Sequence, residues 1–269
     1  MKNHLTYRTK VHHLKVRPYQ FSILYASNCS INIKEEKSHD EINIPKGTIS
    51  FIERNQSLQI HIIKEHNGDA YKVHTLTSDT VRNLINILEP SLKFIPVDIA
   101  NERKLKDKIH IVPGDGINKI LFQSIKENED AASEIYKIAC LILKSDKPEK
   151  IYWSLRLSAS SFFSDRVKNL IESDLTQKWR LSTISEMLSL SEIAVRKKLE
   201  AENTSFYQIL LDARMQKAAK LILDENHHLR KVASSIGMSS TSYFIKTFSS
   251  YYGATPKQFY LYFKNISHQ

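Results

Sequence analysis

Two short stretches in the second half of the chain carry polar and charged side chains along the outer face of a predicted helix. In the first, Arg196 and Lys197 share that face with Glu192 and Ile193. Arginine can donate two parallel hydrogen bonds to one guanine, lysine can contact bases or phosphates, and isoleucine can pack against the methyl group of thymine. These residue types are suited to reading base pairs in the major groove of DNA.

The second stretch lies 49 positions later and carries a weaker set of groups. Its outer face is predicted to present Thr241, Ser242, Ile245 and Lys246. Small hydroxyl groups form fewer directed contacts with bases than a guanidinium does, so we expect weaker readout here. Each basic side chain could instead be a solvated surface charge, and this reading suits Lys198 better than Arg196.

The elements that must position the first set are two short helices. One apolar stripe before Leu190 and a second after it have helical spacing, and Ser191 can cap the start of the second helix. Two short helices that meet at a tight turn can place the second helix in the major groove, although a helical hairpin within a bundle gives the same pattern. The apolar positions are Leu181, Ile184, Met187 and Leu188, then Val195 and Leu199.

The same order of apolar residues occurs a second time, which favours the helix-turn-helix reading. Positions 181, 184, 188 and 190 are matched 48 residues later, and positions 191, 195 and 199 are matched 49 residues later. Gly237 supplies a turn residue in the second copy. The counterparts are Leu229, Val232, Ile236, Met238, Ser240, Phe244 and Phe248.

Between the copies, residues 207–223 carry a continuous apolar stripe and predict one long helix. Seventeen residues at about 1.5 Å each give a rod of about 25 Å. With the bodies of the two units added, the recognition helices could lie about 34 Å apart, which is one turn of DNA. One chain could then occupy two successive major grooves.

From Trp179 to Phe263 the sequence resembles the DNA-binding domain of AraC/XylS-type regulators. Its most specific residues are Ile236 to Ser240, Tyr243, Phe244, Phe248, Tyr252, Gly253, Thr255 and Pro256. The stretches SFFSDRV, SEIAVRKKLE and TPKQFYLYFK, with LYASNC near the start, narrow the resemblance to the enteric virulence regulators of this family. The resemblance implies a transcription regulator of virulence genes, either an activator or an antirepressor, that works with RNA polymerase.

The first hundred residues read mainly as strands. Leu58, Ile60 and Ile62 alternate with polar residues, and turn signals occur at 45–47 and 67–69. We therefore expect an α+β chain. Residues 1–160 should form a β-rich effector-binding or dimerisation domain with helices, which the resemblance makes cupin-like. Residues 161–269 should form an all-α domain with two helix-turn-helix units joined by a long helix.

Relatives of this kind respond to small carboxylates held between the two domains. Such a ligand needs cationic and hydrogen-bonding groups that face one pocket. Thr75 stands where the fatty-acid-binding pattern has arginine, which favours bicarbonate over a fatty acid as the effector, and a purely structural N-terminal domain is the alternative. The candidate effector-binding residues are His12, Arg17, Tyr19 and Lys217.

Other chemistry finds little support in the sequence. The histidines have no HExxH or HxH spacing with nearby carboxylates, so we expect no metal site. We find no nucleophile elbow or paired catalytic carboxylates, and we expect neither an enzyme nor a cofactor. The two cysteines, Cys29 and Cys140, are far apart and are expected to be reduced thiols. The C-terminal aromatic residues could stack on bases, but their helical spacing favours a core.

The net charge of +10 is compatible with a polyanionic partner, for which we expect double-stranded DNA. No apolar run suggests a membrane span or an export signal, so we expect a cytoplasmic protein. The stripe at Ile135, Ile138, Ala139 and Ile142 could form the seam of a homodimer, although core burial is the default. The alternative function is that of a less selective, nucleoid-type DNA-binding protein without effector control.

Overall fold

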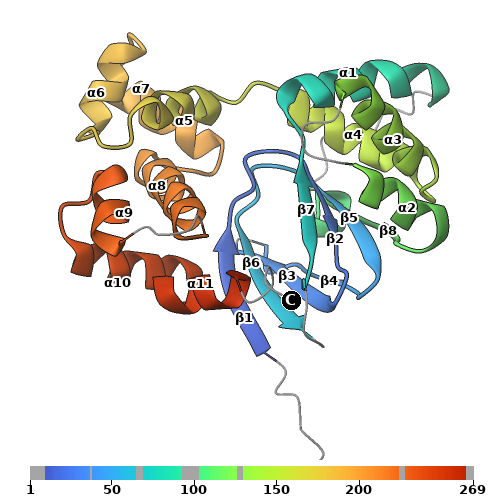
Figure 1. The fold of residues 1–269 in the computed structure, drawn as a ribbon. Helices are drawn as coiled ribbons and strands as arrows, with labels where there is room; N and C mark the ends of the chain where they lie inside the picture. The colour runs from blue at the N-terminus through green and yellow to red at the C-terminus, as the bar shows by residue number, and fades with distance from the viewer. Residues whose placement is uncertain are drawn as a thin grey trace, which may run out of the picture. The chain divides into compact units, whose positions relative to one another are not determined.

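The chain divides into two compact units, residues 1–160 and residues 161–269 (Figure 1). The computed structural model describes residues 10–36, 38–64, 69–92, 103–125, 130–223 and 228–264. Within these ranges the first unit combines strands with helices and the second is built from helices alone. None of the helices described is long and apolar enough to cross a membrane.

Eight strands of the first unit form two antiparallel sheets of four strands each. The first sheet has the order β1-β6-β3-β4 and the second has the order β7-β2-β5-β8. The strands are β1 (Lys10–Val16), β2 (Ser22–Tyr25), β3 (Cys29–Glu35), β4 (Glu41–Ile44), β5 (Thr48–Ile52), β6 (Leu58–Lys64), β7 (Lys72–Thr75) and β8 (Ile109–Pro113).

Alternating burial holds the two sheets together. Along β3, Cys29, Ile31 and Ile33 are buried while the residues between them are more exposed. Ile31 lies opposite Ile62 of β6, so apolar side chains from adjacent strands meet on one face. They join Leu24 and Ile52 of the second sheet in one apolar cluster. This arrangement confirms the β-rich N-terminal fold.

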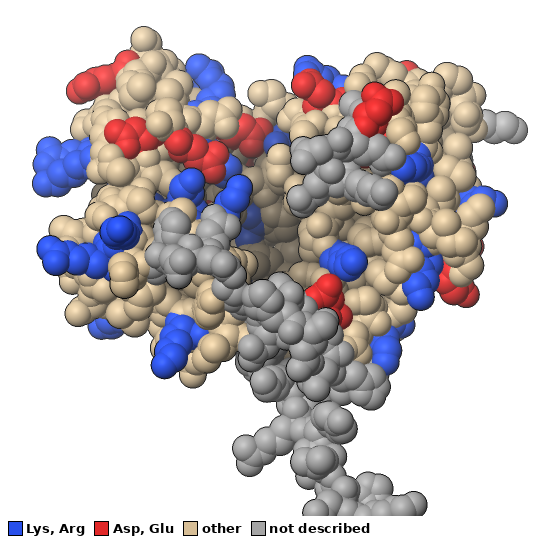
Figure 2. Space-filling model, viewed as in Figure 1, with Lys and Arg blue, Asp and Glu red and all other residues tan. Residues whose placement is uncertain are grey.

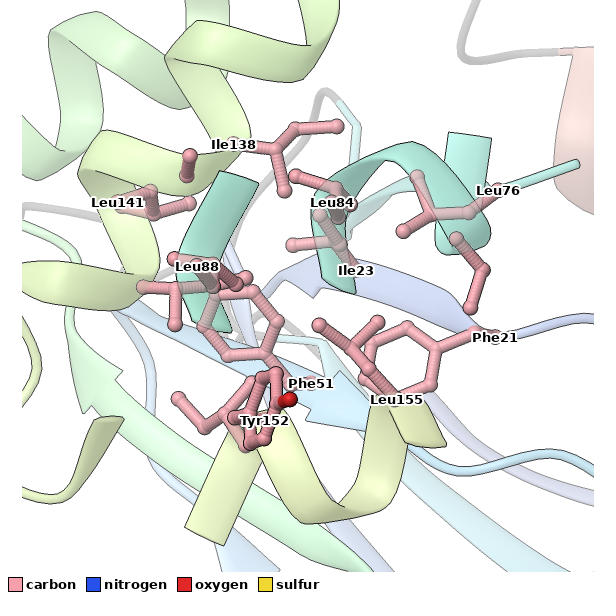
Figure 3. Packing of buried hydrophobic residues seen from close by; sticks show 14 of the residues in the cluster. Phe21, Ile23, Phe51, Leu76, Leu84, Leu88, Ile138, Leu141, Tyr152 and Leu155 are labelled. Atoms are coloured by element: carbon pink, nitrogen blue, oxygen red, sulfur yellow. The ribbon is translucent and has the colours of Figure 1, made fainter. Parts of the chain in front are cut away.

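Helices cover the other face of the second sheet (Figure 1). In Figure 3, Ile23 and Phe51 from the sheet, with Phe21 just before β2, meet Leu84 and other apolar side chains from the helices. These helices are α1 (Ser78–Leu88), α2 (Gly116–Ser124), α3 (Ala131–Leu143) and α4 (Pro148–Ala159), with short 3-10 turns η1 (Glu89–Ser91) and η2 (Leu105–Asp107).

The start of α1 is capped by Thr77, whose Oγ1 atom accepts a hydrogen bond from the Thr80 amide, and Asp79 lies in the first turn of the helix. The stripe from Ile135 to Ile142 on α3 is buried in the same cluster as β2 and β5. It therefore belongs to the core of the unit and is not available as the seam of a homodimer.

The second unit consists of seven helices in the part of the chain described. Val167, Ile184, Val195 and Ile209 come from four of them and share one core. Phe248 stacks edge-on against Phe259 in a further aromatic cluster. The helices are α5 (Phe163–Ser173), α6 (Leu181–Met187), α7 (Glu192–Ala201), α8 (Phe206–Leu223), α9 (Leu229–Ser235), α10 (Thr241–Tyr252) and α11 (Pro256–Lys264).

Candidate nucleic-acid interface

The first helix-turn-helix unit consists of α6 and α7. Ser189, with a φ of 53°, lies in the turn between them. The Oγ atom of Ser191 accepts a hydrogen bond from the Ala194 amide at 3.1 Å and caps α7. Val195 and Leu199 are buried, so the opposite face of α7 is turned outward. This geometry matches the predicted helix boundary.

The second unit, α9 and α10, repeats these features. Gly237, with a φ of 71°, takes the place of Ser189 in the turn. The Oγ atom of Ser240 accepts a hydrogen bond from the Tyr243 amide at 3.2 Å and caps α10. Phe244 and Phe248 are fully buried. The internal repeat of the sequence is thus a repeat of structure.

The outer face of α7 brings together the four residues predicted to contact DNA. The side chains of Arg196 and Glu192 are 62% and 44% exposed, and Arg196 Nη2 lies 3.3 Å from Glu192 Oε2. Ile193 is exposed although it is apolar, and Lys197 is exposed next to Arg196. An exposed ion pair of this kind contributes little to stability, so Arg196 can exchange its partner at small cost.

Lys198 lies on the same helix but faces another way. Its Nζ atom lies 5.7 Å from the centre of the Phe163 ring, on α5. The amides of Phe163 and Ser164 donate to the carboxylate of Glu202 just after α7, at 2.5 and 2.8 Å. These contacts fix α7 against α5, and they direct Lys198 toward α5 and away from the face that carries Arg196.

The outer face of α10 presents Ser242 and Lys246 as exposed residues, while Thr241 and Ile245 are half-buried. Tyr243 is 61% exposed and stands beside them. The helical spacing of the C-terminal aromatic residues, Tyr243 among them, predicts a core. Phe244, Phe248, Tyr252 and Phe259 are buried, and Tyr243 is an exception because it lies one position away from their helical stripe.

The helix α8 connects the two helix-turn-helix units and anchors α10. Asp212 is buried, and its Oδ1 atom accepts hydrogen bonds from Gln208 Nε2 at 2.7 Å and from the Tyr251 hydroxyl at 2.8 Å. The Tyr252 hydroxyl donates to the carbonyl of Met215 at 3.1 Å. Two consecutive tyrosines of α10 are therefore fixed to α8 by hydrogen bonds, of which that of Tyr252 is buried and that of Tyr251 partly buried.

Charge on the visible face of the second compact unit, residues 161–269, is mixed (Figure 2). Acidic side chains gather mainly over α5, α6 and α7, and basic side chains are spread around α8 to α11. In this view no single continuous basic patch covers the second unit.

The candidate effector residues belong to both units. Arg17 and Tyr19 are buried in the first unit, and the guanidinium carbon of Arg17 lies 6.0 Å from the centre of the Tyr19 ring. Lys217 is exposed on α8 of the second unit, and Thr75 is exposed at the end of β7. The side chain of His12 lies outside the described part of the chain.

A partly buried polar network in the first unit was not predicted from the sequence. Arg103 donates two hydrogen bonds to Glu53, each 2.8 Å long, and His110 Nε2 lies 2.9 Å from Ser154 Oγ. Burial, and then the nearby charges of Arg103 and Lys150, lower the pKa of His110 to about 4. Ser154 is fully buried, and its hydrogen bond with His110 joins α4 to β8.

Metal binding finds no support in the described ranges, because no three His, Cys, Asp or Glu side chains there are grouped as ligands. Cys29 is buried and its thiol donates to the Ala70 carbonyl at 3.1 Å, while Cys140 is half-buried and unpaired.

Comparison with known proteins identifies similar regulators. Residues 184–260 match a family model described as a helix-turn-helix domain. The chain is 40% identical over 253 residues to the virulence regulon transcriptional activator VirF of Shigella flexneri, covering 94% of this chain and 96% of VirF. It is 37% identical over 249 residues to the dual transcriptional regulator Rns of Escherichia coli, covering 91% of this chain and 92% of Rns.

Two solved structures share the fold of nearly the entire chain. A crystal structure of apo ToxT K231A from Vibrio cholerae has a TM-score of 0.70 at 16% identity and covers 94% of this chain and 93% of ToxT. Another structure, of ToxT with an unsaturated fatty acid bound, has a TM-score of 0.64 at 17% identity and covers 97% of each chain. Both matches include the β-rich unit as well as the helical one.

Proposed function

Because the chain belongs to the AraC/XylS family of virulence transcription regulators and is a DNA-binding regulator, not an enzyme, we propose that it activates promoters that carry two half-sites. In this proposal α7 reads one half-site and α10 reads the other, on the same face of the duplex. The observation that supports it is the repeated unit, with a serine cap, a turn residue of positive φ and an outward face in both copies.

The length of α8 agrees with this arrangement. Its 18 residues span about 27 Å at about 1.5 Å each. Since successive major grooves on one face of DNA are about 34 Å apart, a rod of this length with a recognition helix beyond each end is of the right size.

We assign different roles to the two reading faces. Arg196 would donate to a guanine, Ile193 would contact a thymine methyl group, and Lys197 would contact a base or a phosphate. Glu192 would accept a hydrogen bond from the amino group of a cytosine or release Arg196 to its base. The second face, which is Thr241, Ser242, Ile245 and Lys246, would contribute weaker base readout.

The change Arg196→Ala tests the first reading face. A two-pronged contact with guanine discriminates by about 1–3 kcal/mol, so affinity for the operator should fall about 5-fold to 150-fold while affinity for random DNA changes little. Lys198→Ala is the matched control, because it removes the same charge from the same helix on the side that faces α5. DNase footprinting and competition with random DNA at fixed salt measure both affinities. Equal discrimination by Arg196→Ala and the parent protein would rule out this role.

The alternative, a nucleoid-type protein without selectivity, makes a different prediction. Binding through phosphates alone is blind to sequence and weakens steeply as salt rises. A specific complex should retain a preference over competitor DNA of about 10³-fold or more at physiological salt. A footprint that spreads evenly over any DNA would support the alternative.

We further propose that a small carboxylate, bicarbonate or a fatty acid, controls DNA binding. A buried guanidinium such as that of Arg17 can hold a carboxylate with two hydrogen bonds, and Tyr19 beside it, His12 and Lys217 could add a hydroxyl and further cations. The bound fatty acid is known for ToxT and not for this chain.

Operator affinity with and without bicarbonate, and with and without oleate, tests the effector. A ligand that shifts the protein between a state that binds the operator and one that does not should change operator affinity, and Arg17→Gln should abolish that change. Lys15→Gln is the control, since Lys15 is exposed on β1 and pairs with Glu36. Equal affinity with every ligand would leave the first unit a structural domain.

Contact with RNA polymerase, a homodimer and a location in the cytoplasm are parts of the same proposal. A transcriptional activator must reach both the DNA and the polymerase, and two copies would double the number of half-sites that one assembly can read. Sedimentation with and without operator DNA measures the oligomeric state.

A further inference from the structure

The turns of the two helix-turn-helix units differ at one informative position. Ser189 and Gly237 occupy equivalent places, and both have positive φ angles, of 53° and 71°. The first turn therefore accepts a residue with a side chain in this backbone conformation. The φ angle alone does not explain why the second turn has glycine.

Close packing explains the glycine. A Cβ atom added to Gly237 would lie 2.5 Å from the carbonyl oxygen of Leu175 and 3.2 Å from that of Thr176. It would also lie 2.8 Å from Arg214 Nη2. Backbone oxygens cannot move aside as the end of a flexible side chain can. The second turn thus lies directly against residues 174–177, with no room for one more carbon atom.

Residues 174–177 belong to the first helix-turn-helix unit, because they lead into α6 and are fixed to its core. Asp174 Oδ1 accepts hydrogen bonds from the Thr176 amide at 2.9 Å and from its hydroxyl at 2.5 Å. The Trp179 indole donates to the Asp174 carbonyl at 2.8 Å, and the indole is buried with Ile184 and Val195. The loop is therefore a rigid surface of the first unit.

Arg214 of α8 completes the contact. Its Nη2 atom donates a long hydrogen bond to the Gln177 carbonyl at 3.5 Å, and the same atom faces Gly237. Its Nε atom is buried without a hydrogen-bond partner in the described ranges, and burial lowers the pKa of this guanidinium. Arg214 thus gives up hydration to lie where α8, the loop and the second turn meet.

We propose that Gly237, Arg214 and the loop 174–177 form a contact that fixes the distance between α7 and α10 and so determines which half-site spacing the protein accepts. The inference rests on the proposed function, in which both helices read DNA. Gly237 and Arg214 act as positioning residues, since neither belongs to the reading faces.

The change Gly237→Ser tests the contact directly, because it places in the second turn the residue that the first turn already has. Ser189→Gly is the matched control in the exposed first turn. Spin labels at Lys198 and Ser250, which are exposed on α7 and α10, report the distance between the helices in the absence of DNA, in a background with Cys140→Ser. We expect one narrow distance for the parent protein and for Ser189→Gly, and a shifted or broader distribution for Gly237→Ser.

If Gly237→Ser does not fold, Arg214→Ala makes the same prediction by removing a side chain from the contact, and Lys220→Ala, at an exposed position of the same helix, is its control. A folded Gly237→Ser or Arg214→Ala protein with the parent distance distribution would overturn the inference.

The DNA test uses an operator selected from random DNA by the parent protein, with one to five base pairs inserted between its half-sites. We expect the parent protein to lose at least 10-fold in affinity on insertion of two base pairs and Gly237→Ser to lose less than 3-fold. Equal loss in both would overturn the inference. If spacing leaves the parent protein unaffected while the label distances still respond, the contact exists and the proposal that both helices read DNA fails instead.

Discussion

At the scale of single residues, the pair formed by Glu192 and Arg196 determines how readily α7 can engage a base. An exposed pair four positions apart on a helix is worth about 0.3–0.5 kcal/mol, whereas a two-pronged contact between arginine and guanine discriminates by about 1–3 kcal/mol. The contact with the base is therefore the stronger of the two. Glu192 competes with DNA for Arg196 without preventing binding.

Replacing Glu192 with Gln should raise affinity for random DNA about twofold to fivefold, because the change frees Arg196 and removes a charge that repels phosphates. Preference for the operator over random DNA should fall. Glu200→Gln on the same helix is the control, since the ion pair described for Arg196 is with Glu192 and not with Glu200. Competition binding at fixed salt measures the ratio. A lower affinity for random DNA would contradict this account of the pair.

His110 makes the stability of the first unit depend on pH. Its pKa is about 4 in the folded chain and about 6.5 in the unfolded chain, so between these values the unfolded state binds more protons. The free energy of unfolding should therefore rise by up to about 3 kcal/mol as the pH goes from 4 to 6.5, and the same amount is lost when the pH is lowered through this range. Urea unfolding at pH 4.5, 5.5 and 6.5 measures the slope. In His110→Gln, which keeps a polar partner for Ser154, the free energy of unfolding should depend less on pH. An unchanged dependence would show that other titratable groups cause it.

At the scale of elements, the two helix-turn-helix units could be predicted because their signals are local. Ser191 and Ser240 precede apolar stripes at helical spacing, and each serine caps its helix in the structure. The strand β8 was not predicted, because its five residues depend on pairing with β5, about sixty positions away in the chain. The contact of Gly237 with Leu175 is likewise non-local and leaves no trace in the sequence beyond the glycine itself.

The two serine caps should be equivalent in energy as well as in place. Ser191→Ala and Ser240→Ala each remove one hydrogen bond to an otherwise unpaired amide at a helix start, at a cost of about 1 kcal/mol. Urea unfolding followed by circular dichroism measures the loss. Ser239→Ala, one position before the second cap and exposed, is the control. A loss at one cap only would show that the repeat is not equivalent in energy.

At the scale of the whole molecule, each unit has a core of its own. Phe51 and Leu84 belong to the core of the first unit, and Ile184 and Val195 belong to that of the second. Separate cores predict separate cooperative unfolding. The chain has two tryptophans, and one lies in each unit, Trp153 on α4 and Trp179 before α6. Each can therefore report on its own unit.

Single-tryptophan proteins can show which unit binds the effector. With Trp179→Phe the fluorescence of Trp153 follows the first unit, and with Trp153→Phe the fluorescence of Trp179 follows the second. A ligand at ten times its Kd stabilises the state that binds it by about 1.4 kcal/mol. The candidate ligand residue Arg17 lies in the first unit, so bicarbonate or oleate should shift the urea midpoint that Trp153 reports. A shift that Trp179 alone reports would favour the candidate Lys217 of the second unit over Arg17, and no shift with either ligand would contradict control by a carboxylate.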